Sequence, residues 1–283
     1  MEKNSAKIKS LVGILVLIAL SGGCVIYVGS SNQSAKFTKI VHMPVTPLAP
    51  GMDFQTMTHN GSIKILGQPV TDCSITATIT ANASTMKKAE EIADGTELSF
   101  EPTPMGLKFK IDRPDNMINC SVGVSLEITL ADKMNLDLES YNGQIKIDNI
   151  YGKTNATTHN GQVTVNNVSG GTILKTYNGQ INAKEISGDI DFISHNGSIN
   201  ADFSQAAVPD CNINIKTYNG GINLTAPQNY SATVDVSTYN GQIDTDLPIT
   251  VTGKFSQKSL KGTIGDGQGQ MKLETHNGSI KIR

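Results

Sequence analysis

The stretch from Tyr141 to Val163 reads YNGQIKIDNIYGKTNATTHNGQV, and it contains one short motif twice, 18 residues apart. The motif is Tyr or His, then Asn-Gly, then usually Gln or Ser, closed by Ile or Val. A motif that returns at a short, nearly constant spacing is typical of repeat proteins, in which each unit buries its apolar face against its neighbours. We therefore expect a fold built from stacked, similar units.

The motif occurs in most of the chain. Copies begin at His59, Tyr141, His159, Tyr177, His195, Tyr218, Tyr239 and His276, and a degenerate copy occupies Leu260–Ile264. From Asn142 onward the spacings, counted with the degenerate copy, are 18, 18, 18, 23, 21, 21 and 16 residues. Such a spacing leaves room for only two short strands and two turns in each unit.

The alternation of side chains around each copy assigns two faces to these strands, because successive side chains of a strand point to opposite sides. The small hydroxyl residue two positions before each Asn shares its parity with aliphatic residues further back, and we expect this set to face inward. The Ile or Val that closes each motif should join it as an aliphatic ladder. The Tyr or His of each motif has the opposite parity and should point outward.

Two all-β architectures can use this pattern. Asn-Gly between alternating strands is a strong hairpin signal, since both central residues of a type I′ turn have positive φ, and hairpins would build a meander. A β-solenoid instead places Asn-Gly at a corner of every coil, where like residues stack and Asn side chains bond along the stack. A meander needs only some turn residue at each bend, so the near identity of the corners favours the solenoid. We predict a parallel β-helix-like solenoid with coils of roughly 18–21 residues.

The first 24 residues resemble a bacterial export signal. Three lysines precede an apolar run from Leu11 to Leu20, and the small residues that follow end at Cys24. This order describes a secretory signal peptide, and the cysteine resembles a lipobox, in which Cys becomes the lipidated first residue. Two alternatives remain: simple secretion, or an uncleaved anchor, since residues 11–30 carry no charge and are long enough to span a bilayer. All three place the body outside the cytoplasm.

The remaining chain divides by pattern into three parts. Residues 25–50 are rich in Ser, Asn and Gln and then in Pro, which predicts a linker that lifts the body off a membrane. Residues 51–135 show strands around one helix, Thr85–Asp94, with Ser84 as N-cap and Gly95 as stop. The narrow apolar face of this helix predicts that it covers a sheet edge or face. Residues 136–283 are predicted to form the repeat solenoid.

Charge and cysteine content restrict the possible partners. The net charge is −2 and the lysines are scattered, so we expect no nucleic acid partner. Cys73 and Cys120 each open a strand-like segment, and they can form a disulfide in an oxidising compartment if those strands are neighbours. Cys211 is an alternative partner for either, and buried thiols are the other interpretation.

The motif copies, the strand-helix-strand opening and the segment Gly265–Gly269 together resemble a family of bacterial envelope proteins described as adhesins, built on a domain of unknown function. The resemblance covers residues 51–283. It implies a β-solenoid that is exported or membrane-anchored, with no established enzymatic activity and no catalytic residues to assign. Family members often carry Asp after the Gly, whereas Gln or Ser usually stands there in this chain.

Catalysis, metals and cofactors are not predicted. Tyr and His exchange freely in the motif, which indicates a slot for a planar ring rather than for imidazole chemistry. A polysaccharide-cleaving enzyme would need clustered carboxylates beside a cation. The close acidic pairs, Asp189 with Asp191 and Asp244 with Asp246, fit a solvated strand face better.

A binding or structural role in the cell envelope is the functional prediction. If the motif rings form an outward row, they offer stacking faces to sugars or a contact surface to another envelope protein. The candidate ligand-binding residues are Tyr141, His159, Tyr177, His195, Tyr218 and Tyr239. The alternative is that the rings only brace the corners by stacking on each other. We expect a membrane-tethered adhesin-like module; an envelope-stress or assembly factor, or a polysaccharide-active enzyme, remain other classes.

Overall fold

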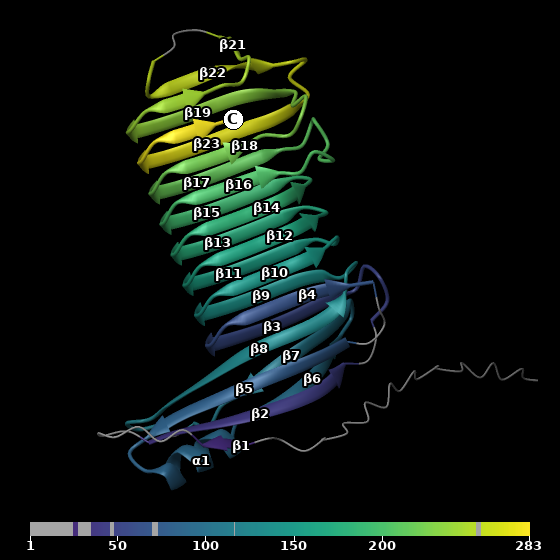
Figure 1. Ribbon diagram of the computed structural model, residues 1–283, viewed down its shortest axis with the longest axis vertical. Coiled ribbons are helices and arrows are strands. Elements are labelled where there is room, and N and C mark those ends of the chain that lie inside the picture. The colour runs from purple at the N-terminus through teal and green to yellow at the C-terminus, as the bar shows by residue number, and fades with distance from the viewer. Residues whose placement is uncertain (1–24, 28–34, 46–47, 70–72, 116, 253–255) are drawn as a thin grey trace, which may run out of the picture.

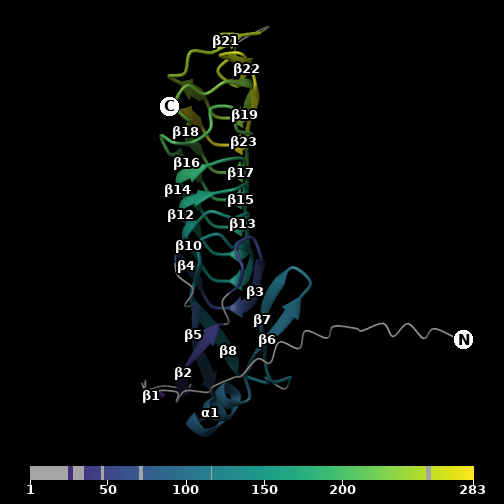
Figure 2. The same ribbon diagram turned by 90° about the vertical axis from the view of Figure 1, so that its right-hand side faces the viewer.

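The computed structural model describes residues 25–27, 35–45, 48–69, 73–115, 117–252 and 256–283. Within these ranges the strands form two twelve-stranded sheets, here called sheet A and sheet B, which are the two layers of an elongated body (Figure 1, Figure 2). Neighbouring coils pair in parallel rather than as hairpins. The predicted all-β solenoid is therefore confirmed.

Each coil contributes one strand to sheet B, turns at Asn-Gly, contributes one strand to sheet A and turns again. In spatial order the coil strands of sheet B are β3 (Asp53–Asn60), β9 (Asn135–Asn142), β11 (Thr154–Asn160), β13 (Thr172–Asn178), β15 (Ile190–Asn196), β17 (Ile213–Asn219), β23 (Gly269–Asn277) and β19 (Ala232–Asn240). Those of sheet A are β4 (Ile63–Gln68), β10 (Ile145–Ile150), β12 (Val163–Ser169), β14 (Ile181–Ser187), β16 (Ile199–Phe203), β18 (Ile222–Thr225), β24 (Ile280–Ile282) and β20 (Ile243–Thr245). In this register the corner Asn of each coil lies opposite the corner Asn of the adjacent coil.

The core between the sheets is a stack of aliphatic side chains, as the alternation predicts. The Ile or Val that closes each motif is buried in every coil: Ile63, Ile145, Val163, Ile181, Ile199, Ile222, Ile280 and Ile243. Burying one such side chain contributes about 2 kcal/mol, which exceeds the roughly 1 kcal/mol net value of a hydrogen bond. The aliphatic ladder is therefore a larger source of stability than any single polar contact at the corners.

The solenoid begins earlier than the sequence pattern predicts. β3 and β4 form its first coil, and Asn60 pairs with Asn142 of the next. Between these two coils the chain leaves the stack and forms β5 (Cys73–Ala83), α1 (Met86–Asp94), β6 (Glu97–Thr103), β7 (Gly106–Asp112) and β8 (Ser121–Ala131). These elements close the N-terminal end of both sheets (Figure 1). The boundary predicted between residues 135 and 136 therefore does not separate the repeats from the rest.

The predicted linker over residues 25–50 is wrong for its described part. It contains β1 (Val25–Tyr27) and the eleven-residue β2 (Ala35–Val45), which pairs antiparallel with β5 along its whole length. Phe37, Met43 and Val45 are buried in the core. β1 pairs with β2 only opposite residues 37–39, so the far part of β2 is an edge strand among the described residues. Proline is tolerated on a sheet edge, and Pro44 sits there without breaking the strand.

Helix α1 begins one residue later than predicted. Its N-cap is Thr85 rather than Ser84, and the Thr85 hydroxyl accepts a hydrogen bond from the Lys88 amide at 3.2 Å. The amide of Gly95 donates to the Glu91 carbonyl and ends the helix, as expected. The buried face holds Ala89, Ile92 and Ala93, and the helix lies at the N-terminal end of the body beside β2 and β5 (Figure 2).

The coils at the C-terminal end do not stack in sequence order. β23 and β24, the last strands of the chain, lie between the coil β17–β18 and the coil β19–β20. The degenerate motif copy is not a corner: it lies in β22 (Ser259–Ile264), which pairs antiparallel with β19. β22 and β21 (Thr250–Val251) form the end of sheet B, where they cap the stack (Figure 1).

The predicted Cys73–Cys120 disulfide does not fit this fold. β5 and β8 are neighbours, as the prediction required, but they run antiparallel, with Ser74 opposite Thr129 and Asn82 opposite Ser121. The two cysteines therefore lie at opposite ends of the strand pair, roughly 30 Å apart at strand rise. Cys24, the predicted lipidation site, and the rest of residues 1–24 lie outside the described residues. In the part that is described, no helix combines the length and the apolar character needed to cross a membrane.

Candidate functional site

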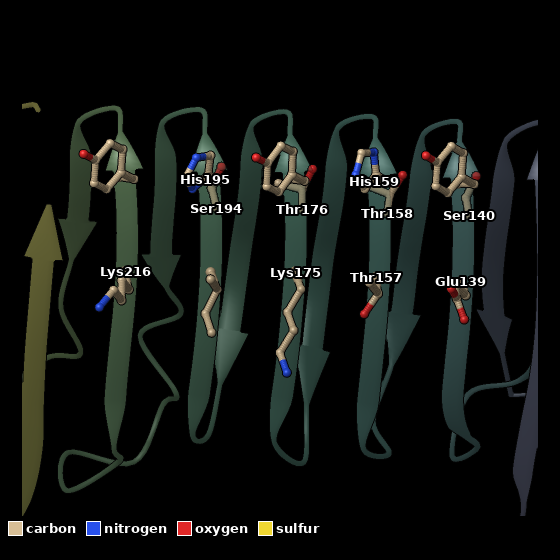
Figure 3. Close-up of a pocket in the computed structure, with 14 residues that line it drawn as sticks. Glu139, Ser140, Thr157, Thr158, His159, Lys175, Thr176, Ser194, His195 and Lys216 are labelled. Atoms are coloured by element: carbon tan, nitrogen blue, oxygen red, sulfur yellow. The ribbon is translucent and has the colours of Figure 1, made fainter. Parts of the chain in front are cut away.

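The motif rings stack on the outer face of sheet B, one from each coil, and we call this stack the ring ladder. In spatial order it consists of His59, Tyr141, His159, Tyr177, His195, Tyr218, His276 and Tyr239. Neighbouring ring centroids lie 4.6–5.2 Å apart and neighbouring planes differ by 2–12°. Figure 3 shows the middle of the ladder. The structure thus brings the six predicted residues together and adds His59 and His276, which the motif also marks.

Imidazole and phenol rings alternate strictly along the ladder, although they do not along the chain. Tyr218 and Tyr239 are consecutive copies in sequence, and the insertion of β23 places His276 between them. No two imidazoles of the described ladder are therefore in contact. Each imidazole of the described ladder is instead in ring contact with phenol rings alone.

The corner asparagines form a second ladder beside the rings. In each of the seven links among the described coils, Nδ2 of one Asn donates to Oδ1 of the next at 2.7–2.8 Å. All of these bonds run in the same direction along the body. These bonds keep the same distance between successive described coils. Each ring belongs to the residue before a corner Asn, so the rings are spaced in the same way.

The corner glycines are required by close approach, not by positive φ. The seven corner glycines from Gly143 onward are absent from the positive-φ residues of the described chain. A Cβ added at Gly179, for example, would overlap the carbonyl oxygen of Gly161 in the coil below. In the coils after the first, the inward hydroxyl donates to the corner-glycine carbonyl of the adjacent coil, and Thr176 Oγ1 donates to Gly161 O at 2.9 Å. The small hydroxyl residue of the motif therefore satisfies a part-buried carbonyl, which explains its inward parity.

Stacking leaves ring edges, not ring faces, open to solvent. Tyr141, Tyr177 and Tyr218 are 43%, 47% and 46% exposed, and Tyr239 at the C-terminal end is 65% exposed. The Nζ of Lys258 lies 5.9 Å from the centroid of the Tyr239 ring, so a cation stands over this end ring. Because neighbouring rings cover each other, the expectation that they offer faces to sugar rings does not fit this geometry. The rings do stack on each other, as the alternative interpretation of a corner brace expects.

A shallow groove of about 590 Å³ runs beside the ring ladder across five coils, and we call it the ladder groove. The ring edges form its wall. Its floor consists of the outward residues two positions before each ring: Glu139, Thr157, Lys175, Ile193 and Lys216. Figure 3 labels Glu139, Thr157, Lys175 and Lys216 on this floor. These floor residues were not among the sequence candidates. Their parity predicts that they point outward. The residue type at this position differs from coil to coil, so it is not part of the repeated motif.

The charges on the groove floor are unevenly paired. Lys216 Nζ lies 3.0 Å from Glu274 Oε1. Lys175 is exposed between Thr157 and Ile193 of the neighbouring strands, and it has no ion pair or hydrogen bond with any described residue. Glu139 lies at the N-terminal end of the groove. The centre of the described groove therefore carries one positive charge without a partner.

The acidic side chains elsewhere on sheet B link the coils. A second depression, of about 680 Å³, lies near the start of the same strands. Around it Asp53, Asp137, Asp189 and Asp191 each accept a hydrogen bond from an Asn side chain of the adjacent coil at 2.6–3.4 Å. Across the described residues, His, Cys, Asp and Glu side chains do not gather in groups of three that could hold a metal ion.

The other acidic pair meets the end of the chain. Arg283 contacts Asp244 and Asp246 with one nitrogen each, at 3.1 Å in both cases, because β24 lies beside β20 in sheet A. All three side chains are exposed, so these ion pairs contribute little stability. Neither of the two acidic pairs, which the sequence analysis assigned to a solvated strand face, lines the ladder groove.

Cys211 is a core residue. Burial, helped by the negative charge of Asp189, raises the pKa of its thiol to about 12. Burial also raises the pKa of the neighbouring Tyr230, whose hydroxyl donates to the carbonyl oxygens of Cys211 at 2.9 Å and Gln270 at 3.2 Å. Since the thiolate is the reactive form of cysteine, a thiol held protonated in this way is inert.

The family comparison agrees with the fold. The model of the Toastrack DUF4097 family matches residues 53–283. The chain is similar to a solved "putative cell adhesion protein" from Clostridium sporogenes, with 14% identity, a TM-score of 0.39, and 87% of this chain and 98% of that one covered. It is also similar to a "putative adhesin" from Bacteroides fragilis, with 9% identity, a TM-score of 0.40, and 86% and 97% covered. No curated protein matches.

Proposed function

The chain belongs to the Toastrack DUF4097 family, and from that premise we propose that it is a non-enzymatic binding module held on the extracytoplasmic side of a bacterial membrane. Its ligand lies in the ladder groove and runs along the solenoid axis. The family match spans the whole solenoid and agrees with the resemblance indicated by the Asn-Gly repeats. Adhesion is the form of binding that this resemblance implies.

The observation that carries the proposal is the continuous ring ladder beside an open groove. Ring contacts and the asparagine ladder hold the described coils at one spacing, so the groove is formed before any ligand arrives. A pre-formed surface loses less conformational entropy on binding than a flexible one. A wall that repeats at every coil suits a linear ligand, because such a ligand meets similar groups at each step.

The groove chemistry supports binding rather than cleavage. Hydrolysis of a glycosidic bond generally uses two carboxyl groups, one on each side of the bond. Among the described residues that line the groove, Glu139 is the one carboxylate. The other lining side chains are hydroxyl, aromatic and aliphatic groups and two lysines, so the described lining holds no second carboxyl group to complete such a pair.

The tether is proposed from the first 24 residues, whose order of basic, apolar and small residues fits an export signal ending at Cys24. Cys24 directly precedes β1, which pairs with β2 at the end of the body that also holds α1 (Figure 1). An anchor at this point would hold the α1 end near the membrane and turn the C-terminal coils away from it. Palmitate labelling that persists in Cys24→Ser would remove the lipid anchor from the proposal.

The test of ligand binding uses an array of linear polysaccharides and the purified full chain. We expect binding that falls at least about tenfold in Ile193→Trp, because the larger side chain fills the groove floor. Lys184→Trp is the matched control: it places the same side chain on the outer face of sheet A, and it should bind like the parent chain. Both variants should keep their melting temperature within about 2 °C.

Three results would contradict the proposal. The first is that no polysaccharide binds. The second is that Ile193→Trp binds as well as Lys184→Trp, which would place the ligand elsewhere on the molecule. The third is release of reducing ends from a bound polysaccharide, which would make the chain an enzyme.

A further inference from the structure

We propose that the ligand of the ladder groove is a linear acidic polysaccharide, with one of its carboxylates placed at Lys175. This inference rests on the proposed function and gives the ligand a chemical class. Three features of the groove carry it: the ring edges that form the wall, the unpaired charge of Lys175, and the small number of cations along the floor.

The groove wall attracts negative and oxygen-rich groups because it consists of ring edges. An aromatic ring is electrically negative on its faces and positive around its edge. Each ring of the ladder has its faces covered by its neighbours at 4.6–5.2 Å, so a ligand in the groove meets edges. The same edges carry phenol hydroxyls and imidazole nitrogens, which can donate hydrogen bonds to hydroxyl, carboxylate and ring oxygens of a sugar.

Lys175 supplies the anion site. Lys175 is exposed in the middle of the floor, with Thr157 and Ile193 beside it on the neighbouring strands, and its side chain extends along the sheet away from the rings (Figure 3). Lys216, the next lysine of the floor, already has a partner in Glu274. No described residue forms an ion pair with Lys175, so a ligand carboxylate placed there would pair with the positive charge at the groove centre. Such charge-assisted hydrogen bonds are stronger than neutral ones.

The low density of positive charge favours a polysaccharide over a nucleic acid. Coils repeat at about 4.8 Å, so the five coils of the groove extend over roughly 20 Å. A nucleic acid strand carries one phosphate per 3.4 Å of axis and would bring about six negative charges into that length. The groove centre offers Lys175 alone, with Glu139 as an opposing charge at one end. A sugar chain brings fewer charges and many hydroxyls, which suit Thr157 and the phenol hydroxyls of the wall.

The test compares acidic polysaccharides with their own methyl esters, which keep the sugar chain and remove the charge. The probes are polygalacturonate, alginate and hyaluronate, added to the purified full chain in a calorimeter. We expect at least one acid form to bind about tenfold more tightly than its ester. Lys175→Gln should weaken the acid form about five- to tenfold and the ester less than about twofold, since only the charge-assisted contact is lost.

Lys184→Gln is the matched control, because it removes the same charge from an exposed lysine on the outer face of sheet A. It should leave both affinities within about twofold of the parent chain. An equal effect of Lys175→Gln and Lys184→Gln would overturn the inference, since net charge alone would then explain the preference.

Two further outcomes separate this inference from the proposed function. Equal affinity for acid and ester, with both lost in Ile193→Trp, would overturn the carboxylate site and leave the groove as the binding surface. Failure to bind any polysaccharide, acidic or neutral, would remove the proposed function and this inference together.

Discussion

At the scale of single residues, the corner motif divides its tasks among neighbours. The ring stacks outside, the Asn bonds along the stack, the Gly lets successive backbones approach, and the closing Ile or Val fills the core. The inward Ser or Thr satisfies the glycine carbonyl of the coil below. Because each residue contacts its own copy in the next coil, one substitution disturbs two interfaces.

The corner glycine gives the sharpest prediction at this scale. Gly179→Ala should lower the free energy of unfolding by about 3 kcal/mol or more, because the new Cβ would overlap the Gly161 carbonyl and backbone cannot move aside as a side chain can. Chemical denaturation measures the change. Gln180→Ser is the control, since other corners carry Ser at that exposed slot, and it should stay within about 0.5 kcal/mol. A mild effect of Gly179→Ala would contradict the close stacking of corners.

The stacking of the ring ladder is testable by removing one ring. Tyr177→Leu would take away the ring that lies between His159 and His195 at 4.6–4.9 Å. Each stacked aromatic pair contributes about 0.5–1.5 kcal/mol beyond its buried area. We therefore expect the variant to lose about 1–3 kcal/mol of unfolding free energy, because two ring contacts are lost.

Tyr177→Phe keeps a planar ring at the same position, and its unfolding free energy should stay within about 0.5 kcal/mol of the parent chain. If Tyr177→Leu is equally mild, ring stacking contributes no stability to the solenoid. The measurement is chemical denaturation of both variants and the parent chain.

At the scale of elements, β2 shows where sequence patterns mislead. Its segment contains Pro44 and follows a stretch rich in Ser, Asn and Gln, which are features of a linker. The buried residues Phe37, Met43 and Val45 share one parity, but polar residues between them weaken the alternation. Only the long antiparallel pairing with β5 reveals the strand. The motif strands, by contrast, were predictable one by one because every coil repeats the same inward and outward positions.

The role of β2 predicts the limits of a soluble fragment. A chain that starts at residue 51 lacks β2, so it loses three buried apolar side chains and leaves the edge of β5 unpaired. The lost burial alone is worth about 5 kcal/mol, and an open sheet edge promotes aggregation. We expect residues 51–283 to aggregate or melt well below residues 25–283, measured by light scattering and thermal unfolding. Equal stability of the two fragments would show that β2 is dispensable.

At the scale of the whole molecule, the stack is capped at its N-terminal end and, in sheet B, at its C-terminal end, and the coils near the C-terminal end are reordered. The antiparallel strands and α1 close the N-terminal end, while β21 and β22 cap sheet B at the other (Figure 1). The last coil of the chain occupies an internal place, so that the C-terminal strands have a partner on each side. Capping of this kind protects the exposed edges of a repeat fold from further pairing.

The coil order can be tested by disulfide trapping. Asn214 is beside Lys272 in adjacent strands, so Asn214→Cys with Lys272→Cys should form an intrachain bridge on mild oxidation. Asn214→Cys with Asp235→Cys should not, because β23 separates those positions by about 9.6 Å. Peptide mapping by mass spectrometry distinguishes the two. A bridge between positions 214 and 235 would mean that the coils stack in sequence order.

The candidate site was predictable only in part. The outward row of rings follows from parity, and all six predicted members lie in it, although His276 separates Tyr218 from Tyr239. Which surface of a ring stays open depends on the distance to the next ring, and that distance is a property of the stack. The floor of the groove depends on register between coils, which no single repeat contains. Lys175 therefore becomes a candidate only once Thr157 and Ile193 are known to lie beside it.

The sequence by itself determined the coil: its approximate length, its inward and outward residues, and its Asn-Gly corner. These features follow from local chain geometry and from alternation, and both repeat in every copy. Only the tertiary structure decided the order of the coils, the inclusion of β2 and β3, and the strict alternation of imidazole and phenol. The physical reason is that all coils present nearly identical edges. Similar edges allow any two coils to pair, so the repeated sequence does not specify which coil lies next to which.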